Sequence, residues 1–190
     1  MLKKKNLILR MLLTLSIYIL SCINLYAAHP EEPIYCKYAD KITEKYCTDM
    51  AKTQKLYCYG EGGGFIKNVN KIDLSFNTIQ TLNIAQARTL IIKCSEELLK
   101  RINADNDIKP YLSHYPFTEQ GLALGISFDD ENQDSVASKF VAMVFAVNGS
   151  VYYSTYNHHK KKFQDIHEET YQEALKIVNN ASKPTIEKKD

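Results

Sequence analysis

Apolar side chains recur every three or four positions between residues 35 and 57, with one gap near Thr53. Lysine and acidic residues fill most positions between them, and the apolar positions are Tyr35, Ala39, Ile42, Tyr46, Met50 and Tyr57. This spacing is typical of an amphipathic helix. Neither proline nor glycine interrupts it, so we predict a helix from about residue 35 to residue 58. Residues 60–64, Gly-Glu-Gly-Gly-Gly, predict the end of this helix and a linker.

A strand pattern and a second helix pattern follow. Residues 71–78, KIDLSFNT, alternate between apolar and polar side chains, which predicts a half-buried strand. Asn83 and Gln86 match a capping box, so we predict that a helix begins here. Cys94 belongs to the apolar stripe of this helix, and we expect it on the buried face.

Later segments predict three further strands. Residues 121–128 form one, and residues 140–147 and 151–156 form a hairpin around Asn148-Gly149. Asn-Gly is the favoured sequence for a type I′ turn between antiparallel strands.

Residues 168–178 repeat apolar side chains at helical spacing and predict a last helix. The predicted order is therefore α-β-α-β-β-β-α. It indicates an α+β domain in which helices pack on one face of an antiparallel sheet of about four strands. We expect this single domain to span residues 29–182 and the tail, residues 183–190, to be disordered.

The first 28 residues have the composition of a signal peptide. Lysines at positions 3–5 precede an uncharged, mostly apolar run from residue 11 to residue 26, and Ala27 and Ala28 supply the small residues that precede a cleavage point. The run is shorter than the ~20 residues that a membrane-spanning helix needs. We therefore expect cleavage near Ala27 or Ala28, export to the periplasm or the medium, and no membrane span in the mature chain.

Two other arrangements of the N-terminus stay open. Residues 19–22, Ile-Leu-Ser-Cys, look like the cleavage box of a bacterial lipoprotein, although Leu20 fits this box poorly. A lipid on Cys22 would hold the protein firmly on a membrane. The other arrangement is an uncleaved anchor.

Composition argues against a nucleic-acid partner. The chain has 24 basic and 22 acidic residues, and four of the basic residues lie in the signal peptide. The mature chain keeps 20 basic residues against 22 acidic ones, whereas nucleic-acid-binding proteins usually carry a strong basic excess.

The dipeptide Tyr-Cys occurs three times at intervals of eleven residues, which places Cys36, Cys47 and Cys58 on the predicted first helix. If that helix is continuous, neighbours in the series lie roughly 16 Å apart on one face. A disulfide requires Cα atoms within about 7 Å. We therefore expect either a bond to another element, most simply to Cys94, or buried thiols. The pairing among these four candidates stays open.

No pattern for metal or cofactor chemistry accompanies the cysteines. The chain contains no Cys-x-x-Cys, and ligands strung along one helix do not converge on an ion. The acidic loop that begins at Asp130 has Ser135 and Val141 where a calcium loop has glycine and glutamate. We expect neither a metal nor a cofactor.

Residues 103–118 form the most aromatic loop of the chain, and two prolines exclude a long helix there. Such a loop either packs over one end of the sheet or lines a binding surface. In the second case Tyr111, His114 and Tyr115 are the binding candidates. Arg88, which borders the stripe of the second helix, either pairs with an acidic neighbour or marks a ligand pocket.

Part of the chain resembles a group of exported bacterial proteins with no assigned activity. The resemblance is carried by NIAQAR (83–88), RINADNDIKPYLSHYPFT (101–118), GISF (125–128) and EETYQEALKIV (168–178), within roughly residues 60–178. Segment 101–118 is the most distinctive, although the group tends to have arginine at the position of Lys109. The resemblance implies an envelope or secreted setting and supplies no catalytic residue.

Together these features favour a non-enzymatic binding or interaction protein of the envelope or the secreted fraction, with a protein or a small molecule as its partner. A small enzyme that uses Tyr111 and His114 with Arg88 is an alternative, but nucleophile and metal-protease motifs are absent. A lipoprotein anchored through Cys22 is a second alternative.

Overall fold

The computed structural model describes residues 32–132 and 134–181, and its helices and strands lie in the compact unit that begins at Ile34. The predicted signal peptide, Cys22 and the predicted tail lie outside the described residues. Within the described part of the chain, no helix combines the length and the apolar composition that crossing a membrane requires.

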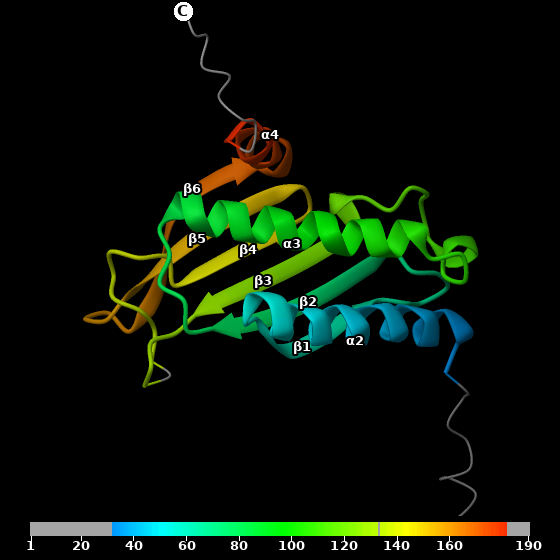
Figure 1. The fold of residues 1–190 in the computed structure, drawn as a ribbon, viewed down its shortest axis with the longest axis horizontal. Helices are drawn as coiled ribbons and strands as arrows, with labels where there is room; N and C mark the ends of the chain where they lie inside the picture. The colour runs from blue at the N-terminus through cyan, green and yellow to red at the C-terminus, as the bar shows by residue number, and fades with distance from the viewer. Residues whose placement is uncertain (1–31, 133, 182–190) are drawn as a thin grey trace, which may run out of the picture. The chain divides into compact units, whose positions relative to one another are not determined.

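In these residues, three α-helices accompany a six-stranded sheet. The elements in chain order are α2 (Ile34–Gln54), β1 (Tyr57–Gly64), β2 (Lys71–Thr78), α3 (Ile84–Ala104), η1 (Lys109–Tyr111), η2 (Glu119–Gly121), β3 (Leu122–Phe128), β4 (Met143–Val147), β5 (Ser150–Asn157), β6 (Lys162–Thr170) and α4 (Tyr171–Ala181). The strands lie side by side in the order β1 to β6. Figure 1 shows α2 and α3 side by side over one face of the sheet, with α4 near the β6 end.

The predicted α+β class is confirmed, whereas the predicted strand number and purely antiparallel pairing are wrong. The described sheet has six strands because two segments that lack a strand pattern pair at its edges. Strands β2 and β3 are parallel, because α3 crosses from the end of one strand back to the start of the other. All other neighbouring pairs are antiparallel.

The glycine-rich segment that the sequence predicts as a linker is the edge strand β1. Helix α2 ends at Gln54, short of the predicted end, and Lys55 takes a left-handed backbone conformation (φ 56°) as the chain leaves the helix. Residues 57–64 then pair with β2, so Cys58 lies on a strand and not on the helix. The Tyr-Cys repeat continues the helical spacing across this break and conceals it.

The pattern of apolar residues does not predict the other edge strand, β6. This strand pairs with β5 although most of its residues are exposed. A strand without a buried face lacks the alternation by which strands are recognised. The last helix therefore begins at Tyr171, and not at Glu168 as predicted, and continues to Ala181.

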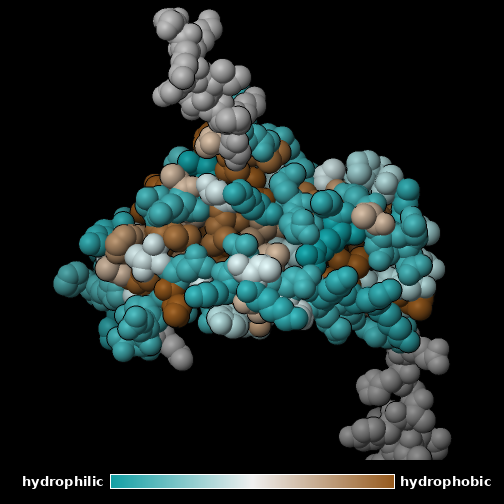
Figure 2. Space-filling model, viewed as in Figure 1, coloured by the Kyte–Doolittle hydropathy of each residue, from teal (hydrophilic) through white to brown (hydrophobic). Residues whose placement is uncertain are grey.

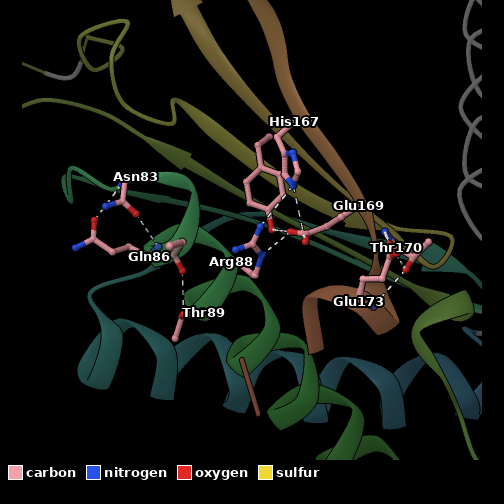
Figure 3. Close-up of polar contacts among 10 residues, drawn as sticks. Asn83, Gln86, Arg88, Thr89, His167, Glu169, Thr170 and Glu173 are labelled. Carbon is pink, nitrogen blue, oxygen red and sulfur yellow. Dashed lines mark hydrogen bonds and ion pairs between the residues drawn. The ribbon is translucent and has the colours of Figure 1, made fainter. Parts of the chain in front are cut away.

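Several local predictions are confirmed. The side chain of Asn83 accepts a hydrogen bond from the N–H of Gln86, and the side chain of Gln86 accepts one from the N–H of Asn83, both at 3.0 Å (Figure 3). Cys94 is buried. The turn between β4 and β5 has positive φ at Asn148 (50°) and Gly149 (77°), as a type I′ turn requires.

Three tyrosines, Tyr46, Tyr153 and Tyr171, are among the largest buried side chains of the core, which lies between the helices and the sheet. Each hydroxyl donates a hydrogen bond of 2.6–2.8 Å, one to the main-chain oxygen of Cys94 and two to carboxylates. Burial, reinforced by these neighbours, raises the pKa of all three phenols above the usual value of about 10. In contrast to this core, the outer surface on the side of α2 and α3 is largely hydrophilic (Figure 2).

These phenols predict alkaline unfolding. A tyrosine whose pKa is higher in the folded state stabilises folding below its unfolded pKa, and that contribution is lost as the pH rises toward the folded value. We expect stability to fall above pH ~10, with the phenolate absorbance of Tyr46, Tyr153 and Tyr171 rising only as the circular dichroism signal is lost. Ionisation of every tyrosine near pH ~10 with the fold intact would contradict this expectation.

Candidate functional site

A cleft of about 720 Å³ lies at the end of the sheet that receives the C-terminal end of α3. Its walls come from three segments: the connection between β1 and β2, the loop after η1, and η2 before β3. The residues that line it are Asn68, Asn70, Ser113, His114, Phe117, Thr118, Gln120 and Gly121. These segments are distant in sequence, and Figure 1 shows them meeting at the same end of the sheet.

Asn103, near the end of α3, holds the loop that forms one wall of the cleft. Its amide group donates hydrogen bonds to the main-chain oxygens of Phe117 (2.8 Å) and Leu99 (2.9 Å). Its side-chain oxygen accepts a third from the N–H of Phe117 (2.7 Å). The Phe117 ring is also buried, so both its main chain and its side chain fix the position of this loop at the cleft.

Main-chain hydrogen bonds join this loop to the opposite wall. The N–H of Val69 donates to the oxygen of Tyr111 (2.8 Å), and the N–H of Ser113 donates to the oxygen of Val69 (2.9 Å). Val69 is fully buried between them. The main chains of the two walls are therefore fixed to each other before any ligand arrives, which lowers the backbone entropy lost on binding.

The described lining of the cleft offers hydrogen-bonding groups but no carboxylate, lysine or arginine. Asparagine, glutamine, serine and threonine side chains both donate and accept hydrogen bonds. Ser113 Oγ and His114 Nδ1 lie 3.3 Å apart, but a serine nucleophile of the triad type also needs an acid that orients the histidine. No such acid lies in the described lining.

Of the four predicted binding residues, His114 lines the cleft. Tyr111 packs against two tyrosine rings of α2, Tyr35 and Tyr38, with ring centroids 5.8 and 6.0 Å away. Tyr115 is 53 % exposed, and the ammonium nitrogen of Lys109 lies 4.1 Å from its ring centroid. The loop thus both packs on the fold and lines a surface.

Arg88 lies near the other end of α3, and the three residues of the predicted enzyme site do not converge. Ala104, at the end of α3, is 16 positions further on, or roughly 24 Å along the helix axis. The loop with Tyr111 and His114 follows Ala104. The structure gives Arg88 the acidic neighbour that was one of its two predicted roles.

That neighbour is Glu169 of β6. Arg88 Nε donates to Glu169 Oε1 at 2.7 Å, Tyr153 Oη donates to the same oxygen at 2.6 Å, and His167 Nε2 lies 3.4 Å from Arg88 (Figure 3). The side chains of Arg88 and Glu169 are only 14 % and 8 % exposed. Burial is the largest single influence and would lower the pKa of Arg88, but the hydrogen bond to Glu169, the charge of that carboxylate and the interactions with Tyr153 together outweigh it and raise that pKa. The group fastens α3 to β6.

A second hollow of about 500 Å³ lies between α2 and α3. Arg101 lines it, but its guanidinium is already engaged by Asp49 (2.7 Å) and Glu97 (2.9 Å). A ligand there would have to displace these ion pairs. The hollow is therefore a weaker candidate than the cleft.

All four described cysteines are thiols in this structure. Cys47 on α2 and Cys58 on β1 lie close together, because the chain reverses after Gln54. Cys94 is buried, and its sulfur lies 4.0 Å from the sulfur of Met50. We expected Cys47 and Cys58 to be too far apart to bond if both lay on one continuous helix. The helix ends between them, so this expectation does not apply.

Sequence patterns did not indicate most of the cleft lining, namely Asn68, Asn70, Ser113, Phe117, Thr118, Gln120 and Gly121. One usable signal exists, since Asn70 and Gly121 each directly precede a strand of the parallel pair β2 and β3. Comparison of the chain with protein-family models, with characterised proteins and with solved structures finds no match.

Proposed function

We propose that the protein is an exported binding protein whose cleft takes a small, uncharged polar ligand. The main support is the lining, in which six hydrogen-bonding side chains surround about 720 Å³ without a carboxylate, lysine or arginine among the described residues. This volume falls within the range of about 300–1,000 Å³ that is usual for small-molecule sites.

A saccharide of one or two rings is the ligand class that matches this lining best. Each sugar hydroxyl donates and accepts a hydrogen bond, and so do the amide and hydroxyl side chains of the cleft. A charged ligand would lose hydration without gaining an opposite charge, which is costly.

Export rests on the composition of residues 1–28, which fits a signal peptide. A lipid on Cys22 would place the same cleft at a membrane surface instead of in solution. The enzyme alternative loses its geometric support, because Arg88 is paired with Glu169 at a distance from His114.

Saccharide binding should depend on His114 and Gln120. Both side chains are exposed, so alanine substitutions should leave the fold intact. We expect His114→Ala and Gln120→Ala each to weaken binding about tenfold, as loss of one or two hydrogen bonds predicts. A panel of neutral mono- and disaccharides, titrated into the isotope-labelled protein and followed by amide chemical shifts, identifies the ligand and measures its affinity.

His159→Ala is the matched control, because His159 is an exposed histidine in the turn between β5 and β6. It should bind as the unmodified protein does. Shift changes confined to residues outside the cleft, or a preference for charged sugars over neutral ones, would refute the proposed site.

A further inference from the structure

Two cysteines and a carboxylate meet where α2 faces β1. The sulfurs of Cys47 and Cys58 and a carboxylate oxygen of Glu61 all lie within 4.8 Å of one another. Cys47 is 8 % exposed, whereas Cys58 is only partly buried. Among the described residues, these three side chains are the group that could hold a metal ion. None of them lines the cleft.

The local fold explains the meeting. Helix α2 ends at Gln54, and the N–H of Leu56 donates to the oxygen of Met50 (3.3 Å) as the chain turns back. Strand β1 then packs against α2. On a continuous helix, an interval of eleven residues would keep the two cysteines apart. Because the chain reverses within this interval, Cys58 returns to the side of Cys47.

We infer that Cys47 and Cys58 form a disulfide that fastens the edge strand β1 to α2 in the exported protein. The inference rests on the export part of the proposed function, because oxidising compartments are where disulfides persist. It does not depend on the cleft or its ligand.

The strand that the bond would hold is a weak one. Residues 60–64 include four glycines, and glycine contributes no side-chain packing and a high entropy cost in a strand. Among the described strands, β1 has a neighbour on one side only, and its pairing with β2 shifts register between Cys58 and Gly60. A disulfide beside the register shift would compensate for the side-chain packing that the glycines of β1 do not provide.

The reaction needs an external oxidant, which we take to be a disulfide of the glutathione type. The Cys58 thiolate, more exposed than Cys47, attacks the oxidant and releases one thiol, which leaves a mixed disulfide on Cys58. The Cys47 thiolate then attacks the Cys58 sulfur and releases the second thiol. The two protein thiols lose two electrons and two protons, and the oxidant disulfide is reduced to two thiols.

A metal ion is the competing occupant of the cluster. Cys47, Cys58 and Glu61 supply three ligands, one fewer than the closed tetrahedral set of a structural zinc site. A disulfide needs no further ligand. Cys94 does not belong to this cluster, and its sulfur packs against the sulfur of Met50 at 4.0 Å.

Peptide mapping of the full-length exported protein tests the pairing. Trypsin places three of the cysteines in separate peptides: Cys47 in YCTDMAK (46–52), Cys58 in LYCYGEGGGFIK (56–67) and Cys94 in CSEELLK (94–100), while Cys36 lies in the peptide that ends at Lys37. After alkylation without reduction, we expect 46–52 joined to 56–67 and Cys94 alkylated. Cys94→Ala should leave the joined peptide unchanged, and Cys58→Ser should abolish it.

Two further measurements separate failure of the pairing from failure of export. The reduced protein, equilibrated with reduced and oxidised glutathione, should form the same joined peptide without any export step. Native mass spectrometry of the reduced protein with zinc alone should show no stoichiometric binding. Alkylation of both Cys47 and Cys58 after glutathione treatment, a different pairing, or one bound zinc would each overturn the inference. If Cys58→Ser does not fold, chemical reduction of the unmodified protein replaces it, with at least tenfold faster amide exchange expected in β1.

Discussion

Replacing Glu169 with alanine should lower the free energy of unfolding by about 3–5 kcal/mol, the largest effect that we expect from one substitution. The carboxylate is 8 % exposed and accepts hydrogen bonds from Arg88 and Tyr153. Its removal leaves a poorly hydrated guanidinium and a buried hydroxyl without their acceptor, and this loss of pairing is more costly than the loss of the attraction itself. Urea unfolding followed by circular dichroism gives the value.

The adjacent Glu168 provides the matched control, because it is an exposed glutamate on the same strand. Glu168→Ala should change stability by no more than about 0.5 kcal/mol. Removing both charges, with Arg88→Met and Glu169→Leu together, should recover much of the loss, since no unpaired charge remains. Equal stabilities of the two single alanine variants would mean that the ion pair does not fasten β6 to α3.

Replacing Asn103 with alanine should lower the free energy of unfolding by about 2–3 kcal/mol and disorder the wall of the cleft. The substitution removes two hydrogen bonds to the main chain of Phe117 and one to Leu99. Two polar groups of Phe117, which is itself buried, then lack their partner. Urea unfolding measures the loss, and amide chemical shifts of residues 109–121 report the state of the wall.

A pair of controls separates loop anchoring from a general loss of stability. Asn103→Asp keeps the acceptor for the N–H of Phe117 but sets an anionic oxygen against the main-chain oxygens of Phe117 and Leu99, so it should destabilise at least as much as the alanine variant. Asn106→Ala, at an exposed position in the following turn, should have little effect. Large shift changes throughout the sheet in Asn103→Ala, with none concentrated in the loop, would contradict the anchoring role.

The central elements of the fold were predictable because each carries a strong local signal. Alternation identifies β2, the Asn83 capping box identifies the start of α3, and Asn148-Gly149 identifies the hairpin. The edge strands lack such signals, since β1 is rich in glycine and β6 has little buried surface. Their strand conformation comes from pairing with a neighbour, which is a tertiary effect that local propensity does not contain.

The candidate site was predictable only in part, for a related reason. His114 belongs to an aromatic, proline-rich loop, and loop composition indicated it. Asn70 and Gly121, in contrast, meet because β2 and β3 are parallel, which brings the starts of both strands to the same end of the sheet. The antiparallel arrangement that the sequence predicts would place the starts of these two strands at opposite ends of the sheet. The Cys47–Cys58 approach likewise depends on where α2 ends.

The parallel junction also has a kinetic consequence. Ile72 of β2 pairs with Leu122 of β3, 50 positions later in the chain, whereas β3 to β6 follow one another as a meander. Pairing between distant residues must wait for the intervening segment to be ordered, which slows folding relative to hairpin formation. We therefore expect the β1–β2 pair and the β3–β6 meander to form as separate parts and to join when α3 docks. Since the cleft lies at the end of the β2–β3 junction, we expect it to form only when the two parts of the sheet have joined.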